Sequence, residues 1–237
     1  MKIAAVIPSR FQSSRFPGKP LVKIAGLTMI ERVYRQVAKA ECFSDIIVAT
    51  DDRRIFNAVV EFGGKVEMTD NNIESGSERV WSVVKKKDFS AVVNIQGDEP
   101  LISEKLIFEV CRALRENPVV SAARPNDSYE DFCSKNVVKV VCDREGRALY
   151  FSRAPIPYSE KKIFPGFFQH IGIYGYTKEM LKMFIGSGVC ELERRENLEQ
   201  LRFLFLGQKV QVIKTDFVSH GVDVPEDVAK IEKLLRG

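Results

Sequence analysis

Three cationic side chains gather in one short segment near the start of the chain. Arg10, Arg15 and Lys19 lie within residues 8–20, PSRFQSSRFPGKP, whose three prolines and one glycine favour neither a helix nor a strand. Guanidinium groups bind phosphate oxygens in pairs, an ammonium adds a point charge, and free backbone amides in such a loop add further donors. The segment matches neither the GxxxxGK[ST] nor the GxGxxG pattern. Two interpretations stay open: a polyphosphate-binding loop and a solvated basic loop.

Carboxylate side chains follow one predicted strand and precede one predicted helix. Asp98 and Glu99 come after the apolar run 91–96 and after Gly97, a residue that would let a ligand approach closely. An acidic pair at the end of a strand suits a magnesium ion, which prefers oxygen ligands. Asp223 stands two residues before the predicted last helix, where an aspartate is more often a helix cap. The basic loop and the two separated carboxylates together predict a site for a metal-bound nucleotide.

The first half of the sequence predicts alternating strands and helices. Short apolar runs are typical of strands buried on both faces, and capping boxes at 28–31 and 75–78 begin two of the helices. The expected strands are 2–7, 45–50, 65–69 and 91–96, and the expected helices are 28–40, one ending at 63, one from 75 to the lysines at 85–87, and one from 103 to before 118. This order predicts an α/β fold with a mainly parallel, mixed sheet and helices on both faces. Ligands of such folds bind at the carboxyl ends of the strands, where residues 8–20 lie.

The second half of the sequence is less regular and predicts a small β-rich lobe. A hairpin is expected at 137–151 around the turn DREG, and a further strand at 170–176. Two helices at 177–186 and 191–206, a strand at 209–214 and a last helix with Pro225 at its first position complete the chain. Because linkers and repeats are absent from the sequence, we expect one domain over 1–237, with about 125–185 as a lobe that elaborates it.

The bulk composition narrows the classes of function. The 237 residues carry a net charge of +4, which is too small to indicate a nucleic-acid partner. No apolar stretch approaches the roughly 18 residues of a membrane span, and the first residues lead into a strand rather than a signal peptide. Five scattered cysteines without a CxxC pair indicate reduced thiols in a cytoplasmic protein, and two histidines argue against a structural zinc site.

Several segments, taken in order, carry a family resemblance. They are IPSRFQSSRFPGKPL, ESGSERV, VVNIQGDEP, ALYFSRAPIP, HIGIYGY, LEQLR and GVDVPED. In this combination the chain resembles the 3-deoxy-D-manno-octulosonate (Kdo) cytidylyltransferases, or CMP-Kdo synthetases. The resemblance implies a nucleotide-diphospho-sugar transferase fold and the reaction of CTP with Kdo to give CMP-Kdo and pyrophosphate, which feeds lipopolysaccharide synthesis. It also implies Mg²⁺ as cofactor and a homodimer.

The resemblance assigns roles to individual residues. It implies catalytic roles for Arg10, Lys19, Asp98 and Asp223, with the two aspartates holding Mg²⁺. The implied nucleotide-binding residues are Pro8, Arg10, Ser14, Arg15, Lys19, Ser75, Gly76, Arg79, Gln96 and Asp98. The implied sugar-binding residues are Arg153, His170, Tyr174, Glu199 and Gln200.

Alternatives remain for three of these residues and for the function. By spacing alone Arg79 would be an exposed helix arginine, Gln96 could bond a neighbouring backbone group, and His170 could be a satisfied interior histidine. A synthetase for another acid sugar, such as a sialic acid, would share the basic loop and the magnesium site. A non-catalytic nucleotide-binding module would keep the fold without the chemistry.

Overall fold

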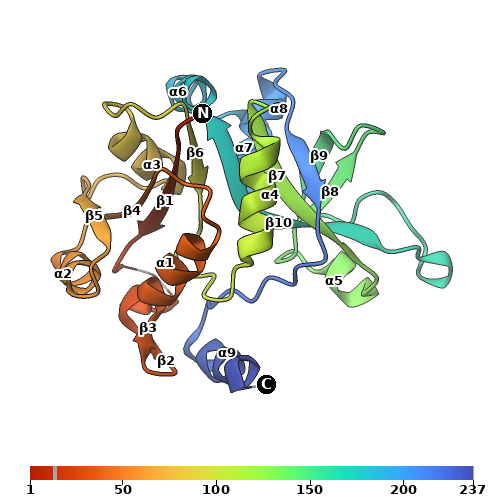
Figure 1. Ribbon diagram of the computed structural model, residues 1–237. Coiled ribbons are helices and arrows are strands. Elements are labelled where there is room, and N and C mark those ends of the chain that lie inside the picture. Colours follow the sequence, from red (N-terminus) through yellow and green to blue (C-terminus); the bar gives the residue numbers. More distant parts are fainter. Residues whose placement is uncertain (13–14, 237) are drawn as a thin grey trace.

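A central sheet organises the molecule (Figure 1). The computed structural model describes residues 1–12 and 15–236. Within them, nine strands form one sheet with the order β11 (Gln211–Lys214), β7 (Val119–Asn126), β10 (Phe167–Thr177), β6 (Ala91–Asn94), β1 (Ile3–Ser9), β4 (Asp45–Thr50) and β5 (Lys65–Met68), while β8 (Lys139–Cys142) and β9 (Ala148–Ser152) extend it beside β10.

The sheet is mixed and mostly parallel. β1 pairs in parallel with β4 and β6, β4 pairs in parallel with β5, and β11 pairs in parallel with β7. β10 runs antiparallel to β6 and β7, so it is the reversed strand of the described order. The predicted α/β fold is therefore confirmed, and the predicted hairpin is present as the antiparallel pair β8 and β9.

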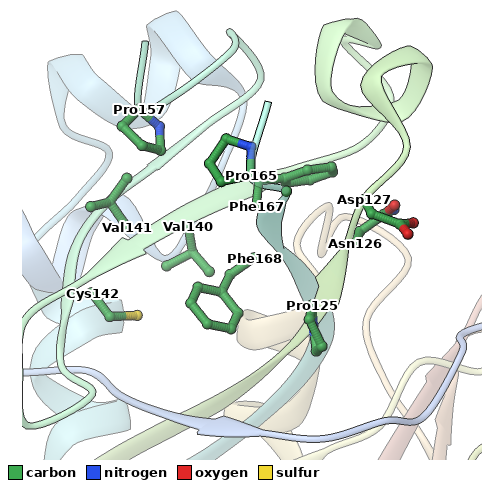
Figure 2. A pocket seen from close by; sticks show the side chains of 11 residues that line it. Pro125, Asn126, Asp127, Val140, Val141, Cys142, Pro157, Pro165, Phe167 and Phe168 are labelled. Carbon is green, nitrogen blue, oxygen red and sulfur yellow. The ribbon is translucent and has the colours of Figure 1, made fainter. Parts of the chain in front are cut away.

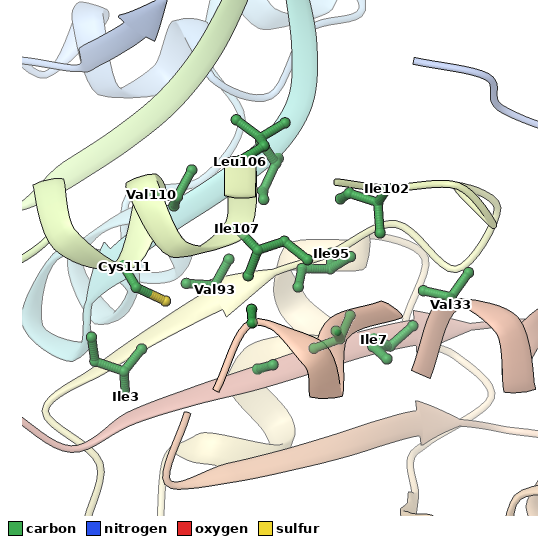
Figure 3. Packing of buried hydrophobic residues seen from close by; sticks show 14 of the residues in the cluster. Ile3, Ile7, Val33, Val93, Ile95, Ile102, Leu106, Ile107, Val110 and Cys111 are labelled. Atoms are coloured by element: carbon green, nitrogen blue, oxygen red, sulfur yellow. The ribbon is translucent and has the colours of Figure 1, made fainter. Parts of the chain in front are cut away.

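Two layers of helices cover the sheet (Figure 1). The helices α1 (Met29–Lys39), α2 (Arg53–Glu61) and α4 (Glu104–Ala113) pack on one face, and α3 (Gly76–Val84), α6 (Lys178–Gly186) and α8 (Leu201–Phe205) pack on the other. In β1, Ile3 and Ile7 point into the first core, part of which Figure 3 shows, and Val6 points into the second. Burying one such side chain contributes about 1.5–3 kcal/mol, so both faces hold the strand in place.

Side-chain caps begin the helices where the sequence predicted. Thr28 accepts a hydrogen bond from the backbone N–H of Glu31, and Ser75 accepts from the N–H groups of Ser77 and Glu78. Glu31 does not complete the expected box, because its carboxylate accepts from Arg35 instead. The caps fix where α1 and α3 begin, which places the loops at the sheet edge.

Several elements differ from the prediction. β7, α5 (Tyr129–Cys133) and the small hairpin of β2 (Lys23–Ile24) with β3 (Leu27–Thr28) were not predicted. Short 3-10 turns lie at Lys19–Leu21 and Lys161–Ile163. The helix predicted over 191–206 is two helices, α7 (Glu191–Glu196) and α8, because Asn197 adopts a left-handed conformation with φ of 52°.

The last helix lies apart from the sheet in Figure 1, beside the β2–β3 hairpin. It is α9 (Pro225–Arg236), and Pro225 is its first residue as predicted. Val222 and Ile231 are buried there with Ile24 and Met29. The segment from β11 to α9 is thereby drawn across the carboxyl end of β6. No described helix is long and apolar enough to cross a membrane.

Candidate active site

Two neighbouring strands deliver the candidate site. β1 ends at Ser9 and its parallel neighbour β6 ends at Asn94, so the loops that follow them leave the same edge of the sheet. Between these loops lies a pocket of about 280 Å³, here called the cationic pocket. Its lining includes Pro8, Arg10, Gln12, Arg15, Lys19, Gln96, Gly97 and Asp98. The described residues of the predicted loop thus contribute to the lining of a pocket.

Lys19 joins the two predicted metal carboxylates. Its Nζ lies 2.7 Å from Asp98 Oδ2 and 3.8 Å from Asp223 Oδ1, and it donates to the backbone carbonyl of Val222 at 2.8 Å. The Arg15 guanidinium binds Asp223 with both Nη atoms, at 3.1 and 2.9 Å. Two carboxylates that are far apart in sequence therefore share one ammonium group.

Asp223 does not cap the last helix, which was the alternative for it. The described contacts at this helix start come instead from Asp227 inside α9, whose Oδ2 accepts from the backbone N–H groups of Asp223 and Val224 at 3.0 and 3.2 Å. The Asp223 side chain is left to face Arg15 and Lys19.

Gly97 brings two loops of the site close together. A Cβ at this position would lie 2.6 Å from Ser9 Oγ and 3.0 Å from the carbonyl oxygen of Pro8. The missing side chain thus lets the loop after β6 pack against the end of β1, where Gly97 also lines the cationic pocket. A backbone hydrogen bond from Val222 to Asp98, at 2.9 Å, ties in the segment before α9.

A second and larger pocket adjoins the cationic pocket. It has a volume of about 610 Å³, shares Gln96 with the cationic pocket, and is called the polar pocket here. Its lining comes from several segments that are distant in sequence and includes Gly76, Ser77, Asn94, Gln96, Glu99, Asn136, Arg153, Gln169, His170, Tyr174, Tyr176, Asn197, Glu199, Gln200, Ser219 and Asp223. All five predicted sugar-binding residues are among them. Asp223 belongs to this lining, so the shared ammonium of Lys19 lies where the two pockets meet.

Unpartnered polar atoms mark the polar pocket as a binding site. Asn94 Oδ1, Glu99 Oε2 and Gln200 Nε2 are buried without a hydrogen-bond partner among the described residues. A buried polar atom without a partner costs about 1–3 kcal/mol, so three in one pocket call for a ligand with many hydroxyl groups or for water. The Gln96 amide also has no hydrogen-bond partner in the described part of the chain, which removes the alternative of a backbone partner.

Burial controls the protonation of three ring side chains that form one wall of this pocket, His170, Tyr174 and Tyr176. Burial lowers the pKa of His170 to about 3, so its imidazole is neutral near pH 7. Burial raises the pKa of Tyr174 and Tyr176, so both phenols keep their protons. The wall therefore offers neutral groups for hydrogen bonding rather than charges.

Two carboxylates and one guanidinium complete the polar pocket. Glu199 Oε2 accepts from Ser77 Oγ at 2.7 Å. The Arg153 guanidinium donates to the backbone carbonyls of residues 135, 196 and 197, which holds it rigidly and still leaves two of its five N–H groups for a ligand. Glu99 accepts from Ser219 Oγ, and burial raises the pKa of Glu99 to about 7 although this hydrogen bond opposes the shift.

Two of the predicted nucleotide-binding residues, Ser75 and Arg79, do not line these pockets. Ser14 lies outside the described residues. Ser75 caps α3. Arg79 is fully buried, not exposed as spacing suggested, and it donates to Thr69, to Asp51 Oδ2 at 2.8 Å and to the backbone carbonyl of residue 73. Its Nε is buried without a partner in the described structure.

The donor set at the meeting of the pockets fits a magnesium ion. In the described residues no group of three or more His, Cys, Asp or Glu could hold a metal alone. Magnesium usually takes only one or two carboxylates and completes its shell with phosphate and water oxygens. Asp98 and Asp223, gathered around one cation, match that requirement.

A third pocket lies away from the sheet edge (Figure 2). It has a volume of about 570 Å³ and a mainly apolar lining of Pro125, Val140, Val141, Pro157, Pro165, Phe167 and Phe168, with Asn126 and Asp127 at one side. None of the predicted site residues lines it.

Several polar residues of the polar pocket had no role assigned from the sequence, among them Ser77, Asn94 and Tyr176. Asn94 could have been recognised from the sequence as a candidate site residue, because a polar residue inside an otherwise apolar buried strand needs a hydrogen-bond partner. Ser77 and Tyr176 gave no such signal, because their neighbours in space come from distant parts of the sequence.

Comparison with known proteins agrees with this geometry. The chain matches the family described as cytidylyltransferase over residues 4–211. It is 47% identical over 249 residues to a 3-deoxy-manno-octulosonate cytidylyltransferase of Syntrophotalea carbinolica, with 100% of each chain covered. It is 44% identical over 243 residues to a protein of the same name from Bdellovibrio bacteriovorus, covering 99% of this chain and 98% of the other.

Solved structures give the same result. A CMP:2-keto-3-deoxy-manno-octonic acid synthetase complexed with CTP has a TM-score of 0.95 at 35% identity, covering 100% of this chain and 99% of that one. A 4-diphosphocytidyl-2C-methyl-D-erythritol synthase of Anaerococcus prevotii, with a TM-score of 0.67 at 15% identity over 100% and 99% of the two chains, shares the fold alone. The chain therefore belongs to the cytidylyltransferase family, and within it to the 3-deoxy-manno-octulosonate cytidylyltransferases, which are nucleotidyltransferases.

Proposed function

We propose that this enzyme transfers CMP from CTP to the anomeric hydroxyl of Kdo, giving CMP-Kdo and pyrophosphate with the help of Mg²⁺. The observation that carries the proposal is the position of Lys19 Nζ between Asp98 and Asp223, where a cationic pocket meets a polar one. A triphosphate suits the first pocket and a polyhydroxylated sugar suits the second.

The cationic pocket serves the triphosphate. The sugar hydroxyl attacks the α-phosphorus in line with the departing pyrophosphate, so the barrier lies in bringing anions together and in the charge of the leaving group. Arg10, Arg15 and Lys19 bind the phosphate oxygens and stabilise that charge. Losing one preorganised contact of this kind typically lowers the rate about 10²–10³-fold.

Asp98 and Asp223 would hold the magnesium ion. When bound, the ion neutralises charge on the α-phosphate and acidifies the attacking hydroxyl. The two carboxylates give up Lys19 as their shared partner, and its ammonium then binds phosphate oxygens instead. No protein side chain is required as general base.

The polar pocket serves the acid sugar. Arg153, held by three carbonyls, presents its remaining N–H groups to the sugar carboxylate. Tyr174, Glu199 and Gln200 bind hydroxyl groups, and Gln200 Nε2 gains the partner that it lacks within the described chain.

Cytosine binds between Pro8 and Gly76 in this proposal. A Cβ at Gly76 would lie 3.7 Å from Pro8 Cγ, so the two residues are close neighbours. We assign Ser75 and Arg79 to the support of this region, because Ser75 begins α3 and Arg79 fixes residues 69–73 from within.

A synthetase for another acid sugar is the alternative, and a substrate panel separates the two. Pyrophosphate release is measured with CTP, Mg²⁺ and either Kdo or a sialic acid. We expect turnover with Kdo, and we expect Asp98→Asn to abolish it while CTP still binds. Turnover of the sialic acid but not of Kdo would refute the proposal, and unchanged turnover in the variant would refute the metal role.

The proposal includes a homodimer formed through the lobe at about 125–185. Tyr158 and Ile163 are large apolar residues of this lobe with exposed fractions of 86% and 74%. Exposed aromatic side chains of this kind are enriched in protein interfaces. The apolar pocket of Figure 2 lies in the same lobe.

A further inference from the structure

A bulge in β10 creates an unusual hydrogen bond beside the polar pocket. Ile171 pairs with Ala122 and Tyr174 pairs with Ser121, so Gly172 and Ile173 are extra residues on β10. Bulges of this kind interrupt the ladder and redirect side chains. The carbonyl oxygen of Ile173 accepts from the Ser121 side chain instead, with Oγ at 2.9 Å.

The Ser121 hydroxyl has two close neighbours but only one proton. Its Oγ lies 2.9 Å from Ile173 O and 2.9 Å from His170 Nε2. A carbonyl oxygen cannot donate, so the hydroxyl proton must lie between the two oxygens. The contact with His170 then needs a proton from the imidazole, which places that proton on Nε2.

The second nitrogen of His170 is then an acceptor. The imidazole is neutral because burial lowers the pKa of His170 to about 3, and a neutral ring carries one N–H. Nδ1 has no hydrogen-bond partner among the described residues. The ring edge otherwise packs against Phe151 and Tyr174, with ring centroids 5.1 and 5.4 Å away.

The geometry points to Ser121 as a positioning residue that fixes His170 as the Nε2–H tautomer, so that Nδ1 accepts a hydrogen bond from a hydroxyl group of the sugar. Ser121 is fully buried and does not line the polar pocket, whereas His170 does. The selection of a hydroxyl rests on the proposed function, but the tautomer itself does not.

This assignment separates two roles in the polar pocket. A neutral acceptor does not attract the sugar carboxylate, so that group is left to Arg153. His170 instead distinguishes a hydroxyl from a hydrogen atom or an ether oxygen at one sugar position, since neither replacement can donate. Once the sugar covers Nδ1, an analogue that cannot donate leaves this acceptor without a partner, and a site of that kind discriminates strongly against such analogues.

Long-range ¹H–¹⁵N correlation of the imidazole signals tests the tautomer directly. The chain has only two histidines, and a His220→Asn variant assigns the remaining signals to His170. We expect a protonated Nε2 and an unprotonated Nδ1 at pH 7 in the protein without substrates. A protonated Nδ1, or two protonated nitrogens, would overturn the inference whatever the enzyme's substrate proves to be.

Ser121→Ala tests the positioning role. Without its acceptor the ring loses the preference for Nε2–H, and we expect the KM for Kdo to rise about tenfold, the value of one hydrogen bond, while CTP binding is unchanged. Ser44→Ala is the matched control, because Ser44 Oγ also donates to a backbone carbonyl, that of Ile3 at 2.9 Å, away from both pockets. If the Ser121→Ala enzyme keeps the wild-type tautomer and the wild-type KM for Kdo, the positioning role of Ser121 is overturned. If this variant does not fold, the spectrum of the wild-type protein still decides the tautomer of His170.

Discussion

Single residues of the site are held by contacts that a ligand can replace. The Arg15–Asp223 pair is exposed, with side-chain exposed fractions of 64% and 53%, and such pairs contribute about 0–1 kcal/mol. Lys19 is more buried, at 14%, but its ammonium has carboxylate and carbonyl partners to exchange for phosphate oxygens. Substrate binding therefore costs little of the stability of the fold.

Arg15→Ala should consequently weaken the binding of CTP without a comparable loss of folding stability. We expect the free energy of unfolding to change by less than about 0.5 kcal/mol, because the lost pair is exposed. The Kd for CTP should rise at least about tenfold through loss of a charged hydrogen bond. Denaturant unfolding and calorimetric titration measure the two effects. Arg35→Ala, which removes an exposed pair with Glu31, is the control and should leave the Kd unchanged.

His170 should make stability depend on pH. Its native pKa of about 3 lies below the ordinary value of 6.5, so between these values the unfolded chain binds more protons. Stability from this group is complete above pH 6.5 and is lost as the pH falls toward 3. His170→Gln should lower the slope of unfolding free energy against pH by about 1.4 kcal/mol per unit in that window. Parallel curves for wild type and variant would contradict this, and His220→Gln controls for loss of an imidazole.

At the scale of elements, Lys139 in β8 connects two segments that line the polar pocket. Its side chain is fully buried, and Nζ donates to the carbonyls of residues 134, 137 and 153 at 2.9, 2.7 and 2.5 Å. These carbonyls belong to the loop before β8 and to the end of β9, which carry Val137 and Arg153 into the polar pocket. The buried ammonium group of Lys139 therefore holds these two segments together through its three hydrogen bonds.

Lys139→Met should disturb these two segments of the polar pocket, although Lys139 itself does not line the pocket. The substitution keeps the volume but leaves three carbonyls without their donor, and we expect unfolding to become easier by about 1–3 kcal/mol. The KM for Kdo should rise more than the KM for CTP, because only the polar pocket loses its support. Lys178→Met, which removes a lysine bound to the carbonyl of residue 87 at 2.5 Å, is the control. Equal changes in both KM values would argue against a local role.

Local signals explain which elements could be predicted. Thr28, Ser75 and Pro225 act within one turn, so the helices that they begin were found from the sequence. β7 was missed although most of its residues are buried, since Arg124 and Pro125 interrupt its apolar pattern.

The site itself depended on contacts between distant segments. The basic loop and Asp98 could be placed at one sheet edge by topology. The link from Asp223 to Arg15 spans 208 residues. The sequence pattern alone therefore left Asp223 open between a metal ligand and a helix cap, and the family resemblance favoured the metal ligand.

At the scale of the whole molecule, one sheet connects the candidate site with the lobe. The edge shared by β1 and β6 carries the cationic pocket, and β8 and β9 extend the sheet into the lobe (Figure 1). The lobe contributes Arg153 and His170 to the polar pocket and exposes Tyr158 and Ile163 on its surface. If the proposed dimer and sugar site are both correct, assembly of two copies and binding of the sugar involve the same part of the chain.

The double variant Tyr158→Ser, Ile163→Ser should convert a dimer to a monomer. Both side chains are apolar and exposed, so the exchange removes interface area without opening the core. Light scattering after gel filtration gives the mass of the particle. Phe108→Ser, at an apolar residue of α4 with an exposed fraction of 52%, is the control. A double variant that remains dimeric, or a monomeric wild type, would contradict the prediction.

The most direct test of the mechanism is the number of Mn²⁺ ions bound per protein at saturating CTP, measured by electron paramagnetic resonance. Mn²⁺ replaces Mg²⁺ as a hard cation with oxygen ligands. We predict that Asp98→Asn and Asp223→Asn each bind fewer ions than the wild type, while Asp216→Asn, an exposed residue of the segment between β11 and α9, does not. Ion binding in both site variants that equals the wild type would contradict the convergence of these two carboxylates on one metal–triphosphate.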